Sequence, residues 1–158
     1  EDGIHKAKNV FRYFEDTYWI SGLGKSNVTF EVYFFKYPYT VKEVEIQWKF
    51  PAKYFTVSGL LSDGYWRYFH KEKKNRATTS HINTMNRDLM GIKIIMKEST
   101  TMIGDNSIYG IQNLYIHTGA RFLRREACKD VMLNANLFEI IDVMNINDVV
   151  GNETIKMS

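Results

Sequence analysis

The densest group of chemically active side chains in the sequence is a basic run. Lys71, Lys73, Lys74 and Arg76 surround a single acid, Glu72. Clustered cations of this kind attract phosphate, sulfated glycan or an acidic patch on another protein. The alternative is a solvated loop, because an intervening acid and a long polar stretch are typical of ordinary exposed surface. The run is therefore a candidate binding loop for an anionic ligand.

A second candidate combines an aromatic ring with two cations. Lys49 precedes Phe50, and Lys53 follows it across a short break at Pro51. An aromatic face beside ammonium groups suits stacking against a sugar or contact with an acidic partner. The alternative is that Phe50 packs in the core while both lysines stay solvated, with their stems along apolar surface.

No arrangement of residues in the sequence predicts an enzyme. The four histidines, His5, His70, His81 and His117, show none of the spacings that place two metal ligands on one helical turn. Cys128 is interpreted as a structural or interchain thiol, because no partner motif accompanies it. A Walker loop and a dinucleotide fingerprint are also absent. We therefore expect a role in recognition and no catalytic residues.

The composition is that of one globular domain, with at most a small appendage. The chain has 158 residues, of which 44% are hydrophobic and 15% aromatic, and its net charge is +3. A domain of this size buries a sizeable core without disulfides or metals. The weak positive charge lacks the basic stripe that nucleic-acid binding requires, and no apolar run is long enough to predict a membrane span. Because the chain starts at Glu1 without a methionine, we expect it to be part of a longer precursor.

Alternation of apolar and polar residues predicts strands through the first three quarters of the chain. Val44 to Phe50 is the clearest example. Ile92 to Met96 is almost uniformly apolar, which predicts a central strand buried on both faces. Trp19, Trp48 and Trp66 are expected to pack in the core or at the rim of the sandwich. The predicted strands are 28–35, 44–50, 54–58, 66–69, 92–96 and 109–116.

Two segments lack this alternation. Residues 70–88 are long and polar, so we interpret them as a large loop with at most one short strand. Further on, residues 121–132 are charged without alternation, and apolar residues recur at helical spacing between 136 and 150. The sequence therefore predicts an all-β antiparallel sandwich over 1–119 and a helical C-terminal tail over 120–158.

The order of these signals resembles the discoidin, or coagulation-factor type C, domain, which is a galactose-binding-like jelly roll. The opening pattern of that family, Thr-aromatic-Trp followed by Ser, is similar to Thr17-Tyr18-Trp19-Ile20-Ser21. A valine- and isoleucine-spaced strand that ends in tryptophan corresponds to Val41 through Trp48. The most specific piece is the turn Ser62-Asp63-Gly64-Tyr65-Trp66, which has one residue fewer before the tryptophan than is usual. The resemblance covers roughly Ala7 to Gly119, and the amino-terminal half-cystine that type C domains often pair is absent.

The resemblance implies that loops at one end of the sandwich bind the ligand. The corresponding loops are Lys49–Tyr54 and His70–Asn86. Their candidate ligand-binding residues are Lys49, Phe50, Lys53, Lys71, Lys73, Lys74, Arg76 and His81. Membrane insertion is not expected, because these loops contain few bulky apolar residues.

A structural calcium ion is the one cofactor that the resemblance implies, since many relatives of this fold bind one where Glu15 and Asp16 lie. The alternative is an acidic loop without an ion. Calcium takes about six to eight oxygen ligands, and only two carboxylates are local.

We therefore expect a non-catalytic recognition or adhesion module of a secreted, multidomain protein, located outside the cell or at its surface. Its partner would be a glycan or another protein. One alternative is a scaffolding domain whose tail, Ala120 to Val150, docks onto other domains of an assembly. Another is an accessory carbohydrate-binding domain of a glycoside-processing enzyme, with the active site outside this chain.

Overall fold

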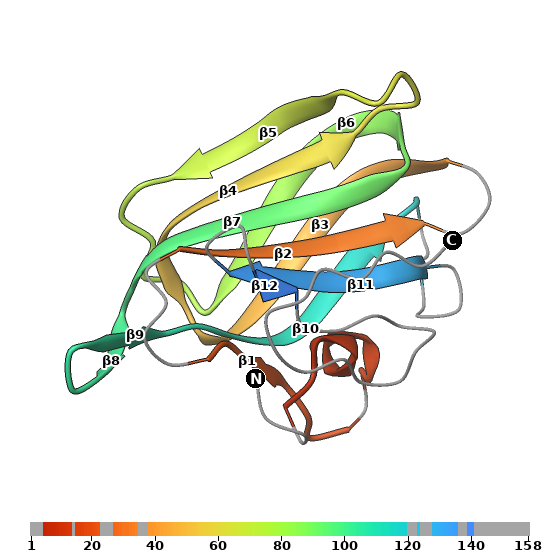
Figure 1. Cartoon of the computed structure of the whole chain (residues 1–158). Coiled ribbons are helices and arrows are strands. Elements are labelled where there is room, and N and C mark those ends of the chain that lie inside the picture. Colours follow the sequence, from red (N-terminus) through yellow and green to blue (C-terminus); the bar gives the residue numbers. More distant parts are fainter. Residues whose placement is uncertain are drawn as a thin grey trace.

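The computed structural model describes most of the chain up to residue 119 and short segments beyond it. The described residues are 5–13, 15–22, 27–34, 38–119, 123, 128–135 and 139–140. They form two antiparallel sheets that face each other, which confirms the predicted all-β sandwich (Figure 1). Among them, no helix has the length and apolar character that a membrane span requires.

The smaller sheet has four strands. Their spatial order is β1 (Trp19–Ile20), β10 (Gly110–His117), β3 (Tyr39–Phe50) and β6 (Thr79–Leu89). The central strand β3 pairs with β10 on one side and β6 on the other, so Glu45 lies opposite both Tyr115 and His81. Because side chains alternate along a strand, Val44 and Ile46 face the core while Glu45 points outward.

The larger sheet has six strands. Their spatial order is β12 (Glu139–Ile140), β11 (Cys128–Ala135), β2 (Asn27–Phe34), β7 (Gly91–Ser99), β4 (Ala52–Leu60) and β5 (Trp66–Glu72). The strand β7 lies between β2 and β4, which confirms its predicted central position. Ile92, Ile94 and Met96 are fully buried, whereas Lys93 and Ile95 are partly exposed. The prediction that both faces of this strand are buried is therefore wrong, because nothing described covers the outer face.

Three short elements complete the described fold. The 3₁₀ helix η1 (Ala7–Phe11) packs beside β10 and adds Val10 to the core. The strands β8 (Thr101–Ile103) and β9 (Asn106–Ile108) form a hairpin that projects from one end of the sandwich (Figure 1).

The core is built from alternate residues of both sheets. Trp19 meets Phe30 with ring centroids 5.2 Å apart, and Trp48 meets Phe55 at 5.1 Å. Both pairs are inclined edge to face, an arrangement that aromatic rings prefer. Trp19 and Trp48 are thus core residues, as predicted. Trp66, in β5, lies on the outer face of the larger sheet, where Lys93 of β7 contacts its ring.

The segment predicted as a large loop, residues 70–88, is mostly strand, so that prediction is wrong. The end of β5 and nearly all of β6 occupy it, and only residues 73–78 connect them. Few apolar residues mark the core face of β6: Ile82 points inward, but the next inward position is Thr84. The Thr84 hydroxyl donates to the Val41 carbonyl at 2.7 Å, which allows a polar side chain to be fully buried there.

The described part of the C-terminal tail is extended. In β11, Val131 pairs with Val32 of β2, so Cys128–Ala135 forms part of the larger sheet. The predicted helix is wrong for these residues, because pairing with the free side of β2 satisfies their backbone groups in an extended form. The helix predicted between 136 and 150 is also wrong at β12, where Glu139–Ile140 pairs with β11 as a strand. For the other residues of that range, which lie outside the described part of the chain, it stays a prediction.

Candidate functional site

The two loops predicted to bind ligand lie against each other at one end of the sandwich. Asn75, in the turn between β5 and β6, is 5% exposed, and its Nδ2 donates to the Ala52 carbonyl at 3.0 Å. Its backbone N–H donates to the Lys53 carbonyl at 2.8 Å. These bonds hold the β5–β6 turn against the start of β4. The exposed cations of this basic end are Lys53, Lys73, Lys74 and Arg76.

Lys49 and Phe50, at the end of β3, pack beside Tyr18. The rings of Phe50 and Tyr18 meet edge to face with centroids 6.4 Å apart, and Lys49 Nζ lies 4.7 Å from the Tyr18 centroid. Phe50 also covers Gly110, where an added Cβ would lie only 2.7 Å from its ring. These contacts favour the packing alternative for Phe50.

A groove of about 540 Å³ lies on the outer face of the larger sheet, over β5, β4 and β7. Strand register places Lys71, Thr56 and Ile95 in one row across these three strands. Tyr54 and Lys97 form the next row, toward the basic end. The remaining lining residues are Tyr68, Phe69 and His70.

The groove combines exposed aromatic rings with ammonium groups. Lys71 Nζ and Lys97 Nζ lie 5.8 Å and 5.5 Å from the centroid of the Tyr54 ring. Tyr68 is 69% exposed, so one face of its ring is available for contact. An aromatic ring offers a flat apolar surface, and the ammonium groups offer charge-assisted hydrogen bonds to anions.

The floor of the groove contains a hydroxyl group without a partner. Thr56 is only 7% exposed, and its Oγ1 accepts and donates no hydrogen bond. A buried polar group left unsatisfied costs about 1–3 kcal/mol. The oxygen itself is enclosed by its neighbours, so it lies beneath the surface of the groove.

The same face carries a second aromatic–cation contact beyond the groove. Lys93 Nζ lies 4.1 Å from the centroid of Trp66, whose ring meets Tyr33 edge to face at 6.2 Å. Burial lowers the pKa of Lys93, and the nearby Glu31 carboxylate opposes that shift. The Tyr33 hydroxyl donates to Glu31 at 2.7 Å, which holds this acid beside the lysine.

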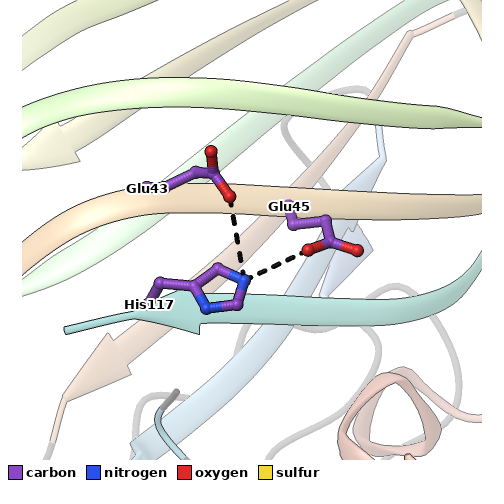
Figure 2. A group of neighbouring side chains, drawn as sticks. All are labelled: Glu43, Glu45 and His117. Carbon is purple, nitrogen blue, oxygen red and sulfur yellow. Dashed lines mark hydrogen bonds and ion pairs between the residues drawn. The ribbon is translucent and has the colours of Figure 1, made fainter. Parts of the chain in front are cut away.

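A row of acids and histidines lies on the outer face of the smaller sheet. Figure 2 shows Glu43 and Glu45 of β3 converging on one ring nitrogen of His117 from β10. His117 Nε2 is 3.1 Å from Glu45 Oε1 and 3.8 Å from Glu43 Oε2. On the other side of β3, His81 Nδ1 is 3.3 Å from Glu43 Oε2. His81, which the sequence grouped with Lys71, thus lies on the opposite sheet.

Three side chains that could bind a metal ion come together in this row. One oxygen of Glu43, one oxygen of Glu45 and one ring nitrogen of His117 all lie within 4.8 Å of one another. Among the described residues, this is the group of histidine, cysteine or acidic side chains that is close enough to share a metal ion. Glu15 and Asp16 are exposed in the segment between η1 and β1. The calcium ion predicted at Glu15 and Asp16 stays a prediction.

Sequence reasoning missed most residues of the groove and of the acid–histidine row. Alternation along one strand shows which of its residues share a face, but not which strand lies beside it. The sequence signal that could have indicated two acids on one face is the alternation of Glu43 and Glu45 in a clearly amphipathic strand. His117 lies 72 residues from Glu45, so only the register of β3 with β10 brings them together.

Solved structures of similar fold include several carbohydrate-binding modules. A chitosan-binding module of a chitosanase/glucanase from Paenibacillus sp. IK-5 has a TM-score of 0.65 at 16% identity, covering 74% of this chain and 88% of that chain. The family 32 carbohydrate-binding module of Streptococcus pneumoniae EndoD has a TM-score of 0.55 at 13% identity, covering 65% and 75%. The Clostridium perfringens module CpGH89CBM32-4, in complex with GlcNAc-α-1,4-galactose, has a TM-score of 0.56 at 12% identity, covering 73% and 83%.

No protein-family model and no curated protein matches the sequence. At these low identities the solved structures establish the fold alone. The chain has the galactose-binding-like, discoidin-type jelly-roll fold that the sequence pattern predicted.

Proposed function

We propose that this chain is a non-catalytic glycan-binding module and that its ligand occupies the groove over β5, β4 and β7. The observation that carries the proposal is the Tyr54 ring flanked by Lys71 and Lys97, with the exposed Tyr68 in the same groove. Similar folds that bind chitosan or GlcNAc-α-1,4-galactose support a saccharide as the class of ligand. The proposed surface is a sheet face, which differs from the end loops expected from the sequence.

The charge of the groove favours an acidic glycan. Lys71 and Lys97 line it, and the exposed lysines Lys53, Lys73 and Lys74 lie where it meets the basic end. Carboxylate or sulfate groups would form charge-assisted hydrogen bonds with these ammonium groups, while a sugar ring stacks on tyrosine. A polycation such as chitosan would be repelled by the same lysines.

Such a module would work outside the cell, as one part of a larger glycan-processing or surface protein. One of the structural neighbours is a module of a chitosanase/glucanase, which supports that context. The scaffolding alternative depends on the tail, and no described contact favours it over glycan binding.

Calorimetric titration of the full chain with a sulfated or uronate-containing oligosaccharide, and with its neutral counterpart, tests the proposal. We expect Tyr68→Ala and the double variant Lys71→Ala/Lys97→Ala each to weaken binding of the acidic sugar about tenfold or more. Tyr65→Ala and Lys42→Ala are matched controls, because both side chains are exposed and neither lines the groove. These controls should bind as the wild type does.

Two other outcomes would change the proposal. If the groove variants bind normally while Lys53→Ala/Lys73→Ala/Lys74→Ala does not, the ligand lies at the basic end, as the sequence predicted. If the neutral sugar binds as tightly as the acidic one, the preference for an anion is wrong.

A further inference from the structure

We propose that Glu43, Glu45 and His117 form a zinc-binding site on the outer face of the smaller sheet, separate from the proposed glycan groove. Figure 2 shows one carboxylate oxygen of each glutamate directed at the same nitrogen of the His117 ring. Zinc with bonds of about 2.1 Å and tetrahedral geometry keeps its ligand atoms about 3.4 Å apart. The His117 nitrogen lies 3.1 Å from Glu45 Oε1 and 3.8 Å from Glu43 Oε2, so small side-chain rotations would place all three at bonding distance.

The donor set favours a transition metal such as zinc over calcium or magnesium. One imidazole nitrogen and two carboxylate oxygens give three protein ligands, the number that zinc takes in open sites with water in the fourth position, and imidazole is a ligand suited to zinc. Calcium and magnesium prefer oxygen ligands alone, and calcium needs about six to eight of them. The side chains of His117, Glu45 and Glu43 are 24%, 17% and 35% exposed, so an ion could enter from solvent and keep a water ligand.

A chain of hydrogen bonds orients one of the carboxylates. Gln47 Nε2 donates to Glu45 Oε2 at 3.0 Å, which leaves Oε1 turned toward His117. Gln47 is held in turn by Asn113, whose Nδ2 donates to Gln47 Oε1 at 2.8 Å and which is 7% exposed. Partners behind the ligands of this kind fix ligand orientation and raise metal affinity.

The acids themselves supply a driving force. Glu43 and Glu45 are two residues apart on one strand, so both carboxylates lie on the same face and repel each other. A cation between them relieves that repulsion. Without metal, His117 Nε2 hydrogen-bonds with Glu45 and lies within ion-pair distance of Glu43, and His81 pairs with Glu43 from the other side.

Isothermal titration of zinc into the full chain at pH 7.5 tests the site. We expect one zinc ion per chain, with affinity reduced at least tenfold in Glu45→Gln and in His117→Gln. His70→Gln is the matched control, because His70 also faces a glutamate, Glu72 at 3.4 Å, but is not part of the three-ligand group. Gln47→Leu should weaken zinc binding by about 10–100-fold through loss of ligand orientation alone.

Cobalt provides a second readout. Co²⁺ bound at this site should give the intense visible absorption of a tetrahedral complex, and the bands should disappear in Glu45→Gln. Equal zinc affinity in wild type, His117→Gln and Glu45→Gln would overturn the proposal, as would no binding to the wild type. If His117→Gln does not fold by circular dichroism, Glu45→Gln decides, because it preserves the shape of the side chain.

The zinc and glycan proposals fail independently. Glu45→Gln should bind acidic glycan as the wild type does, because the groove lies on the other sheet. Tyr68→Ala should likewise bind zinc normally.

Discussion

The ammonium nitrogen of Lys93 lies 4.1 Å from the centroid of the Trp66 ring on the outer face of the larger sheet. Burial lowers the pKa of this lysine, so the contact involves a partly desolvated cation. A cation over tryptophan contributes about 0.5–1 kcal/mol at exposed sites and about 2 kcal/mol when desolvated. The pair therefore stabilises the sheet face that adjoins the proposed glycan groove.

A double-mutant cycle measures this contact. Urea denaturation of Lys93→Met, Trp66→Leu and the double variant should give a coupling energy of about 1 kcal/mol. Lys97→Met combined with Trp66→Leu is the control, because Lys97 is placed over Tyr54 instead. Its effects should add within about 0.5 kcal/mol. Strict additivity in the Lys93 cycle would show that the contact contributes nothing.

Two buried threonines should respond oppositely to removal of the hydroxyl. Thr84→Val breaks the bond to the Val41 carbonyl and should lower the free energy of unfolding by about 1–3 kcal/mol. Thr56→Val removes a hydroxyl that has no partner, so stability should be unchanged or higher. Thermal and urea unfolding compare the pair, and equal losses in both would contradict this account of Thr56.

Removal of the Asn75 side chain should loosen the basic end. Asn75→Ala leaves the Ala52 carbonyl and the Ala77 N–H without their partners, which should cost about 1–3 kcal/mol. Asn106→Ala, at an exposed position of the β8–β9 hairpin, should change stability by less than about 0.5 kcal/mol. Urea denaturation checks both, and a stable Asn75→Ala would mean that the loops stay joined by other contacts.

Two buried glycines differ in what an added methyl group would meet. At Gly91 a Cβ would lie 2.5 Å from the Val32 backbone oxygen, whereas at Gly110 the nearest atom is in the Phe50 ring at 2.7 Å. Both alanine variants should lose about 1–3 kcal/mol or more. Phe50→Leu should partly restore stability to Gly110→Ala, because a side chain can be made smaller. It should not restore Gly91→Ala, where backbone must move; rescue of both would contradict the model of local contact.

Alkaline pH should destabilise the fold through Tyr109. Burial raises the pKa of Tyr109 from 10.0 to about 12, a shift that a hydrogen bond from Ser107 opposes and that the charge of Glu98 increases. Below pH 10 the phenol is protonated in both folded and unfolded chains, and its contribution is fully present. Between about pH 10 and 12 the unfolded chain ionises first, so stability falls as pH rises, by on the order of 3 kcal/mol in total.

Urea denaturation between pH 9 and 12 measures that loss. Tyr109→Phe should show a shallower decline, because phenylalanine does not ionise. In an absorbance titration, this variant should also lack the tyrosine that ionises at the highest pH. If the stability of Tyr109→Phe falls as steeply with pH as that of the wild type, other groups cause the loss of stability at alkaline pH.

Much of the fold could be predicted because strand residues carry their own signal. The alternation in Val44 to Phe50 and the apolar run at Ile92 to Met96 reflect contacts with one common core. The alternation did not predict a strand where a polar side chain is buried in the core and forms its hydrogen bond there. Thr84 breaks the apolar pattern of β6, and its hydroxyl compensates with a hydrogen bond that only the folded chain provides.

The sequence by itself determined an all-β sandwich and the outward position of residues such as Glu45, because pleat alternation is local. Only the tertiary structure decided which outward side chains meet. The groove requires Lys71, Thr56 and Ile95 to share one row, and the acid–histidine row requires Glu43 to lie opposite His117. Each of these contacts depends on the register between strands that are distant in the chain. Register is set by the packing of the whole core, so local pattern could not reveal it.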